Sequence, residues 1–301
     1  MTNTALEITK FYASQGGMSD PGKNSDLLEG LPEDMGELCR IVQQNLIHVF
    51  WAERYGRKLS EADRATLNIR TVAGKLETMR QADGLPQSAG WSLSAGRAIE
   101  QRQVGNCRDF TLLLTAILRQ QGRAARARCG FATYFMPNHY EDHWVCEYWN
   151  EKQGGWVLVD AQLDDLQQEK LGLTFDALDV PREQFIVAGK AWQMCREGRA
   201  KPEQFGIFDM NGWWFIWGDV VRDFLSLNKV EILPWDYEVG FFTHPLEDPF
   251  PQDKDEVAEY DRIARLTTAG DEAFEEIRRF YSEDGRWRVP EGWMEYLPVG
   301  R

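Results

Sequence analysis

Apolar residues recur at helical spacing in several parts of the chain, most clearly after position 107. Within 107–121, five apolar side chains fall at i, i+3, i+4, i+7 and i+8, and Gly122 follows. This pattern predicts an amphipathic helix that ends at the glycine. The five residues are Phe110, Leu113, Leu114, Ile117 and Leu118.

The same spacing predicts further helices on both sides of this segment. We expect helical structure over 32–82, including a helix over 61–80 that a Ser60–Asp63 capping box would start. Weaker patterns predict helices at 183–197, at the end of 211–227, and at 254–266 and 270–282. The segment 83–90 is typical of a linker or turn.

Strand-like runs follow the central helix. They cover 126–135, 143–149 and 156–160, and polar, glycine-containing turns separate them. A helix followed by a meander of antiparallel strands predicts an α+β fold, with additional helices from both ends of the chain.

We find no internal repeat and no clear domain boundary. Residues 1–30 are polar and glycine-rich, and we expect a loop or partly ordered arm there. The rest, 31–301, is predicted to be a single domain, with its core at 97–165 and a helical, tryptophan-rich elaboration at 170–301.

The net charge of −14 and the pI of about 4.9 limit the classes of partner that the protein is expected to bind. Nucleic-acid affinity comes mainly from clustered Lys and Arg, so we expect no nucleic-acid binding. Docking on anionic lipid is also disfavoured. No uninterrupted apolar stretch approaches a membrane span, and the first residues do not resemble a secretory signal. The oligomeric state is not predictable.

The cysteines and histidines are few and widely spaced. The five cysteines are Cys39, Cys107, Cys129, Cys146 and Cys195, with no CxxC pair. We therefore predict no disulfide framework, metal site or cofactor, and a cytoplasmic location. The four histidines are His48, His139, His143 and His244. Any chemistry that needs imidazole must use one of these four.

Cys107 stands where the central helix begins, directly after Gly105 and Asn106. A helix N-terminus presents backbone N–H groups and a partial positive charge, and both favour a thiolate. The same N–H groups can stabilise an oxyanion close to the sulfur. The position suits a nucleophile, although a small buried cysteine at a helix start is the simpler interpretation of this residue alone.

His143 and Asp160 favour the nucleophile. The turn 150–155 between the last two strands predicts a hairpin. If His143 is opposite Asp160, the centre of the hairpin falls between Glu151 and Lys152, and the two side chains are neighbours on one face. A carboxylate beside an imidazole orients it.

The alternative base is His139, which would face Asp164 in the same register. The sequence around His139 is more typical of a loop than of a strand, and this favours His143.

The segment 102–131 resembles the core motif of the transglutaminase-like superfamily. The motif residues present are Gly105, Cys107, Arg108, Asp109, Phe110, Leu118, Arg119, Gly122 and Arg126. His143-Trp144-Val145 resembles the second motif of this family, and Gly155-Trp156 with Asp160 resembles its third motif. The family usually has proline where Ala125 and Ala161 stand. Neither position is chemical, so we expect activity to be retained.

The resemblance implies a papain-like α+β fold and thioester chemistry on amides, with Cys107, His143 and Asp160 as the catalytic residues. The substrate is then a peptide, a protein or a small amide, and the thioester is resolved by water or by an amine acceptor. Hydrolysis is slightly favoured because nothing in the sequence marks an amine site. The alternative is a catalytically silent module that binds a peptide or protein in the same groove.

Several residues, and one apolar run outside the motifs, can each be interpreted in two ways. Gln101 and Trp91 are candidates for a second oxyanion donor, but the sequence identifies neither, and Arg108 and Asp109 are expected to anchor the helix start. The apolar run 211–219 is either a substrate groove or, more simply, part of the core.

Overall fold

The computed structural model describes residues 3–82, 92–236, 250 and 253–289. The chain forms two compact units, each assembled from separate stretches of sequence. The first comprises residues 1–8, 127–144 and 181–301, and the second comprises residues 9–126 and 145–180. The division into an arm and a single domain, drawn from the sequence, stays a prediction.

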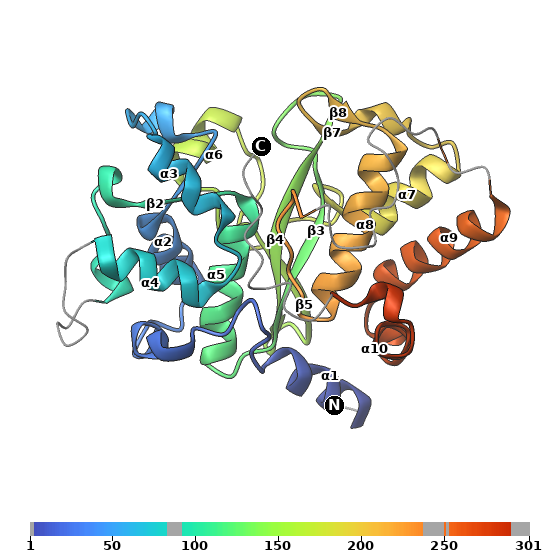
Figure 1. Ribbon diagram of the computed structural model, residues 1–301, viewed down its shortest axis with the longest axis horizontal. Helices are drawn as coiled ribbons and strands as arrows, with labels where there is room; N and C mark the ends of the chain where they lie inside the picture. Colours follow the sequence, from blue (N-terminus) through green and yellow to red (C-terminus); the bar gives the residue numbers. More distant parts are fainter. Residues whose placement is uncertain (1–2, 83–91, 237–249, 251–252, 290–301) are drawn as a thin grey trace. The chain divides into compact units, whose positions relative to one another are not determined.

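The fold is mixed α+β, as predicted (Figure 1). The α-helices are α1 (Asn3–Tyr12), α2 (Met35–Asn45), α3 (Glu61–Ala65), α4 (Val72–Ala82), α5 (Cys107–Gln120), α6 (Asp165–Leu171), α7 (Ala188–Arg196), α8 (Trp213–Leu227), α9 (Lys254–Thr268) and α10 (Phe274–Glu283). The strands are β1 (Leu46–His48), β2 (Gln103–Gly105), β3 (Ala125–Ala132), β4 (Tyr140–Asn150), β5 (Gly155–Val159), β6 (Phe185–Val187), β7 (Phe205–Ile207) and β8 (Met210–Asn211). Short 3₁₀ helices connect them, among them η1 (Gly22–Leu28) and η5 (Ile99–Gln101).

The second unit is built around α5. All five apolar residues of the predicted stripe are buried, and Leu114, Ile117 and Leu118 are 0% exposed. Helix α2 packs against α5, and its Leu38 and Val42 are also completely buried. The predicted helix at 107–121 is thus confirmed, and it forms the core of its unit.

The first unit contains most of one sheet and the C-terminal helices. Its strand order is β6-β3-β4-β7-β8, and α7, α8 and α9 pack together beside it (Figure 1). Trp217 of α8 stacks on Tyr260 of α9, with ring centroids 3.5 Å apart. At Gly189 of α7, an added Cβ would collide with Thr267 and Ala264 of α9, so this close helix contact requires glycine. The run 211–219 is therefore largely core, as the simpler interpretation had it.

The sheet differs from the predicted meander in one respect. The β4–β5 pair is antiparallel, as predicted, but β7 runs parallel to the start of β4, with Tyr140 opposite Phe205. The sheet is therefore mixed. The parallel pairing joins residues far apart in sequence, and local periodicity carries no signal for it.

Two helical predictions need correction. The helix predicted over 61–80 is broken, because Thr71 Oγ1 accepts the N–H of Gly74 at 3.1 Å and so starts a new helix, α4. His48 lies on the short strand β1 and not on a helix. The Ser60–Asp63 capping box is confirmed. The helices predicted at 254–266 and 270–282 are also confirmed, as α9 and α10.

The N-terminal stretch is more ordered than expected. Where we predicted a loop or partly ordered arm, η1 forms and buries Leu27 and Leu28. Ser19 accepts a hydrogen bond from Arg119 Nη1 at 2.8 Å, and it is 0% exposed. This glycine-rich segment is part of the core of the second unit.

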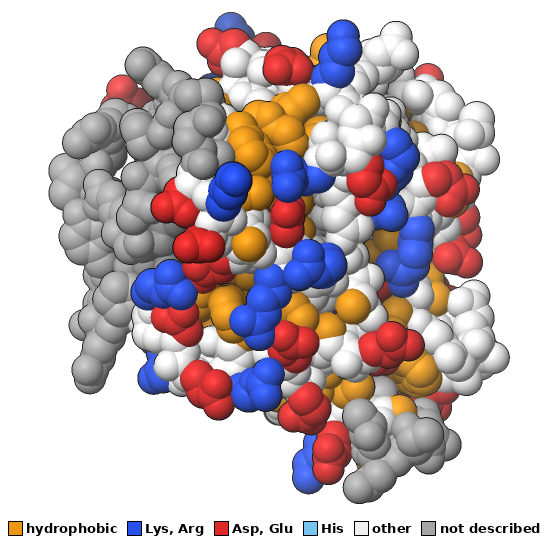
Figure 2. Space-filling model, turned by 90° about the vertical axis from the view of Figure 1, so that its right-hand side faces the viewer, with side chains coloured by type: hydrophobic (Ala, Val, Ile, Leu, Met, Phe, Trp, Pro, Cys, Tyr) orange, Lys and Arg blue, Asp and Glu red, His pale blue; other side chains and the backbone are white. Residues whose placement is uncertain are grey.

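The face drawn in Figure 2 carries acidic and basic side chains interspersed with apolar ones. Among the described residues on that face, neither sign of charge forms a continuous patch. None of the described helices has the length and hydropathy needed to cross a membrane.

Candidate functional site

Cys107 is the first residue of α5, as predicted. Asn106 precedes it as the helix cap, and its side-chain oxygen accepts the N–H of Asp109 at 3.2 Å. Asp109 Oδ2 accepts the N–H of Asn106 in return at 3.1 Å. This reciprocal capping box fixes the backbone on both sides of the cysteine. The Cys107 residue is 9% exposed.

The motif residues after Cys107 anchor the helix start, as predicted. Asp109 Oδ2 also accepts from Lys75 Nζ at 2.8 Å. Arg108 donates to Asp109 Oδ1 at 3.2 Å and to the carbonyl of Arg70 at 2.6 Å. Burial lowers the pKa of Lys75, and the Asp109 carboxylate opposes that effect. At Gly105, an added Cβ would lie 3.0 Å from Asp109 Cβ and Oδ2, so a larger residue would press on this carboxylate.

His143 lies on β4 in the first unit and is 2% exposed. Its ring is surrounded by aromatic rings of the same unit. Phe135, Tyr134 and Phe185 have centroids 4.9, 6.0 and 6.4 Å away. This packing limits how far the imidazole can rotate.

The rival histidine has a different environment. His139 lies in the loop before β4, as expected, and its Nε2 is 3.2 Å from the carbonyl of Gly206 and 3.2 Å from Glu141 Oε2.

Asp160 directly follows β5 in the second unit and is 1% exposed. Its backbone N–H donates to the carbonyl of Ala177 at 2.9 Å. Its Oδ1 accepts the N–H of Gln162 at 3.0 Å. These bonds hold the aspartate backbone and carboxylate in a defined position at the strand end.

The predicted register of the hairpin is wrong by two residues. Cys146 pairs with Val159 and Asn150 with Gly155, so the centre falls between Lys152 and Gln153. The pairing is displaced by two residues from the predicted one, so His143 is not directly opposite Asp160, and β5 ends before this aspartate, at Val159. A shift of two residues keeps each side chain on its predicted face of the strand, since the strand period is two.

The turn chemistry explains the correct register. Asn150 Oδ1 accepts the N–H groups of Lys152 and Gln153, and its carbonyl accepts the N–H of Gly154 at 2.8 Å. Gly154 has φ +64°, a left-handed conformation that favours glycine. The turn therefore comprises four residues, 151–154, and the centre of the hairpin lies one residue later than the predicted position between Glu151 and Lys152.

The structure offers different candidates for a second oxyanion donor from those named in the sequence analysis. Gln101 is exposed at the end of η5, and Trp91 lies outside the described residues. The amides of Gln103 and Asn106 are buried, and their Nε2 and Nδ2 groups have no hydrogen-bond partner among the described residues. Neither amide stood out in the sequence, because burial without a partner is visible only in the fold.

The remaining four cysteines are buried and unbridged. Burial raises the pKa of the Cys146 and Cys195 thiols to about 12, and raises those of Cys39 and Cys129 further. At neutral pH these thiols are protonated and poor nucleophiles. Cys129 and Cys146 lie on β3 and β4, within the strands predicted over 126–135 and 143–149, and both are 0% exposed.

The comparison with protein families agrees with the resemblance found in the sequence. Residues 52–161 match the family model of the transglutaminase-like superfamily. This segment is therefore similar to the transglutaminase-like superfamily, which typically includes cysteine enzymes. The match includes Cys107, His143 and Asp160. The chain matches no curated protein and no solved structure.

Proposed function

We propose that the protein is a cysteine enzyme that transfers an acyl group from an amide or peptide carbonyl, with Cys107 as the nucleophile. The observation that carries the proposal is the position of Cys107 at the capped start of α5, within the transglutaminase-like segment. The proposal includes His143 as the base and Asp160 as the residue that orients it, in a papain-like arrangement.

The proposed reaction has two stages. His143 takes the proton of the Cys107 thiol, and the thiolate attacks the carbonyl carbon to form a C–S bond. The tetrahedral intermediate then collapses, the C–N bond breaks, and His143 gives its proton to the leaving amine. A thioester to Cys107 remains. Asp160 keeps the imidazole in the tautomer that accepts the thiol proton.

The second stage resolves the thioester. Water gives a peptidase or amidase, and an amine gives a transferase. We favour hydrolysis, because water is always present and no described cluster marks an amine site. A cytoplasmic location suits this chemistry, because a reducing compartment keeps Cys107 as a thiol.

The oxyanion of the intermediate needs donors that are already in place. Backbone N–H groups of the first turn of α5 supply one type of donor. We propose a buried amide as the second. Asn106 is the stronger choice, because it precedes Cys107 directly, and Gln103 is the alternative. Asn106→Asp keeps the capping oxygen but removes the donor, so a loss of kcat with the fold intact would support Asn106.

Intact-mass spectrometry with a panel of amide, peptide and thioester substrates tests the main proposal. The wild type should form a covalent adduct that Cys107→Ala lacks. His143→Ala should lower kcat/KM by at least ~1,000-fold, whereas the matched variant His139→Ala should retain activity. No adduct across the panel would contradict the proposal.

Alkylation with iodoacetamide at neutral pH separates an enzyme from a silent binding module. In the enzyme, Cys107 is labelled fast and His143→Ala slows the labelling. In a binding module, Cys107 reacts no faster than an ordinary thiol, and its labelling does not depend on His143.

A further inference from the structure

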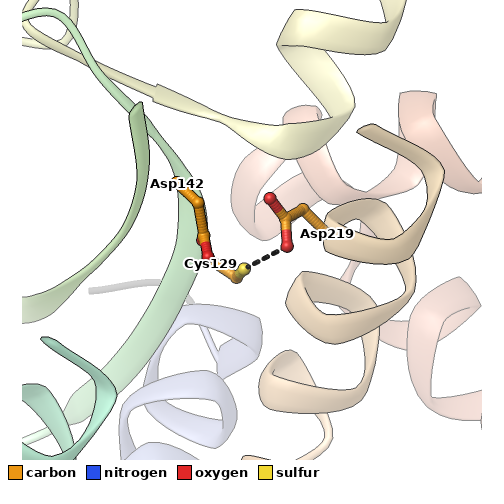
Figure 3. A group of neighbouring side chains, drawn as sticks. All are labelled: Cys129, Asp142 and Asp219. Carbon is orange, nitrogen blue, oxygen red and sulfur yellow. Dashed lines mark hydrogen bonds between the residues drawn. The ribbon is translucent and has the colours of Figure 1, made fainter. Parts of the chain in front are cut away.

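Three side chains from three elements of the first unit converge in its interior (Figure 3). They are Cys129 of β3, Asp142 of β4 and Asp219 of α8. One ligand atom of each lies within 4.8 Å of the corresponding atoms of the other two. Cys129 and Asp219 are 0% exposed and Asp142 is 9% exposed.

The polar groups of this cluster are incompletely satisfied. Asp142 Oδ1 and Asp219 Oδ2 are both buried and have no hydrogen-bond partner among the described residues. A buried carboxylate oxygen without a partner is costly, since burial removes its bonds to water. Two such oxygens beside a cysteine sulfur indicate that something outside the chain completes the group.

The spacing of the cluster suits a small cation. Cys129 Sγ is 3.4 Å from Asp219 Oδ1. In a tetrahedral site with Zn–S of about 2.3 Å and Zn–O of about 2.1 Å, sulfur and oxygen ligands lie roughly 3.6 Å apart. The observed separation therefore requires little movement of these two side chains.

The charges around the cluster also favour a cation. Arg222 Nη1 donates to Asp219 Oδ1 at 2.6 Å, and it supplies one positive charge. Arg128 is engaged elsewhere, since it forms two hydrogen bonds with Asp223. A thiolate and two carboxylates with one guanidinium leave a charge of −3 + 1 = −2. A divalent ion neutralises this charge.

We infer that Cys129, Asp142 and Asp219 bind a divalent zinc-class cation, independently of the proposed enzymatic function. A thiolate ligand selects Zn²⁺ over Mg²⁺ and Ca²⁺, which prefer oxygen ligands only. Three protein ligands leave a fourth position for water or for the second oxygen of an aspartate. On binding, the cation displaces the thiol proton of Cys129 and any proton that the two carboxyl groups hold in its absence, and these protons are released to solvent.

Without the ion, the group must hold protons. Burial raises the pKa of Asp142, and it raises the pKa values of Cys129 and Asp219 well above their usual values. The Cys129–Asp219 contact then serves as a thiol hydrogen bond. Arg222 orients Asp219 in both states.

The inferred role of the ion is to tie β3, β4 and α8 together. Asp219 lies 90 residues after Cys129 in the sequence, so the ion would link α8 to the two strands only in the folded chain. The sequence shows no zinc-ligand spacing, and for this reason we predicted no metal from it.

The test uses the full-length protein, unfolded with a chelator and refolded with Co²⁺ or Zn²⁺. The Cys107→Ala variant serves as the parent, because it removes the thiol proposed to be reactive. We expect about one ion per chain and a cobalt–thiolate charge-transfer absorption. In this background Cys129→Ala should lose the absorption, and Asp219→Asn should weaken binding at least ~100-fold, beyond the 10–100-fold typical of outer-shell changes.

Cys195→Ala, which removes another buried thiol of the same unit, is the matched control and should bind normally. The inference is overturned if the parent shows no cobalt–thiolate absorption with excess Co²⁺, or if Cys129→Ala keeps it. The first criterion needs no ligand variant, so it holds even if Cys129→Ala does not fold.

Discussion

Lys75 and Asp109 form a buried ion pair, with Lys75 Nζ 2.8 Å from Asp109 Oδ2. The two side chains are 8% and 0% exposed. The same carboxylate accepts the N–H of Asn106 and contacts Arg108. One aspartate therefore joins α4 to the start of α5, and it contacts Asn106 and Arg108, the residues on either side of the proposed nucleophile.

Lys75→Met should destabilise the protein by about 3–5 kcal/mol, because it leaves the buried Asp109 carboxylate with one cation fewer. Denaturant unfolding measures this change. Lys23→Met is the matched control. Lys23 pairs with Glu77, which lies on α4 as Lys75 does. The Lys23 side chain is 63% exposed, so its loss should cost less than about 1 kcal/mol. Equal effects would contradict this account of the helix start.

The Arg128–Asp223 pair should have a similar importance in the first unit. Arg128 donates to both carboxylate oxygens, at 2.9 and 2.8 Å. Arg128→Met should therefore cost about 3–5 kcal/mol. Arg196→Met removes the partner of Asp261, a pair whose arginine is 38% exposed, and should cost under about 1 kcal/mol. Chemical denaturation of both variants gives the two free energies of unfolding. A small effect of Arg128→Met would contradict the predicted importance of the Arg128–Asp223 pair.

The hairpin turn predicts opposite effects for two adjacent glycines. Gly154→Ala places a Cβ at φ +64° and should cost about 1–2 kcal/mol. Gly155 has open space around its Cβ position and no positive φ. Gly155→Ala should stabilise the strand by about 0.5 kcal/mol. Thermal unfolding of the two variants gives the sign, and a neutral Gly154→Ala would argue against the four-residue turn.

The buried thiol of Cys146 should make the protein less stable in alkali. Burial raises its pKa from 9.0 to about 12. The folded state therefore holds the proton more tightly, and between pH 9 and 12 the unfolded state binds fewer protons. By linkage, stability falls as the pH rises through this window, by up to roughly 1.4 kcal/mol per pH unit for this group.

Unfolding free energies measured from pH 7 to 11 test this expectation. Cys146→Ala should give a flatter decline above pH 9 than the wild type. Val145→Ala, at a neighbouring buried position on β4 that does not titrate, should lower stability without changing the slope. A Cys146→Ala slope identical to that of the wild type would disprove the assignment.

Much of the fold followed from local pattern. The amphipathic stripe and the glycine that follows it predicted α5, because 3.6-residue periodicity and a C-terminal glycine can be recognised in neighbouring residues. The helices α9 and α10 and strands β4 and β5 were predicted for the same reason. The position of Cys107 at the helix start is therefore a sequence-level result.

Other features depend on contacts that a local pattern does not contain. The three-residue strands β1, β2, β6 and β7 are too short for a periodic signal. The hairpin register depended on the left-handed Gly154, not on the count of turn residues. The Cys129–Asp142–Asp219 cluster unites positions 90 residues apart, and no spacing rule covers that separation.

The interleaved composition of the two units has a consequence for synthesis on the ribosome. Every residue of the second unit lies before position 181, whereas the first unit needs the stretch 181–301. Because chains emerge from their N-terminus and units fold as they become complete, the second unit can fold first. The segment 127–144, which carries His143, must then wait for the last helices to be translated. A nascent chain stopped at residue 180 would hold Cys107 and Asp160 in a finished unit while the residues around His143 still lack their partners.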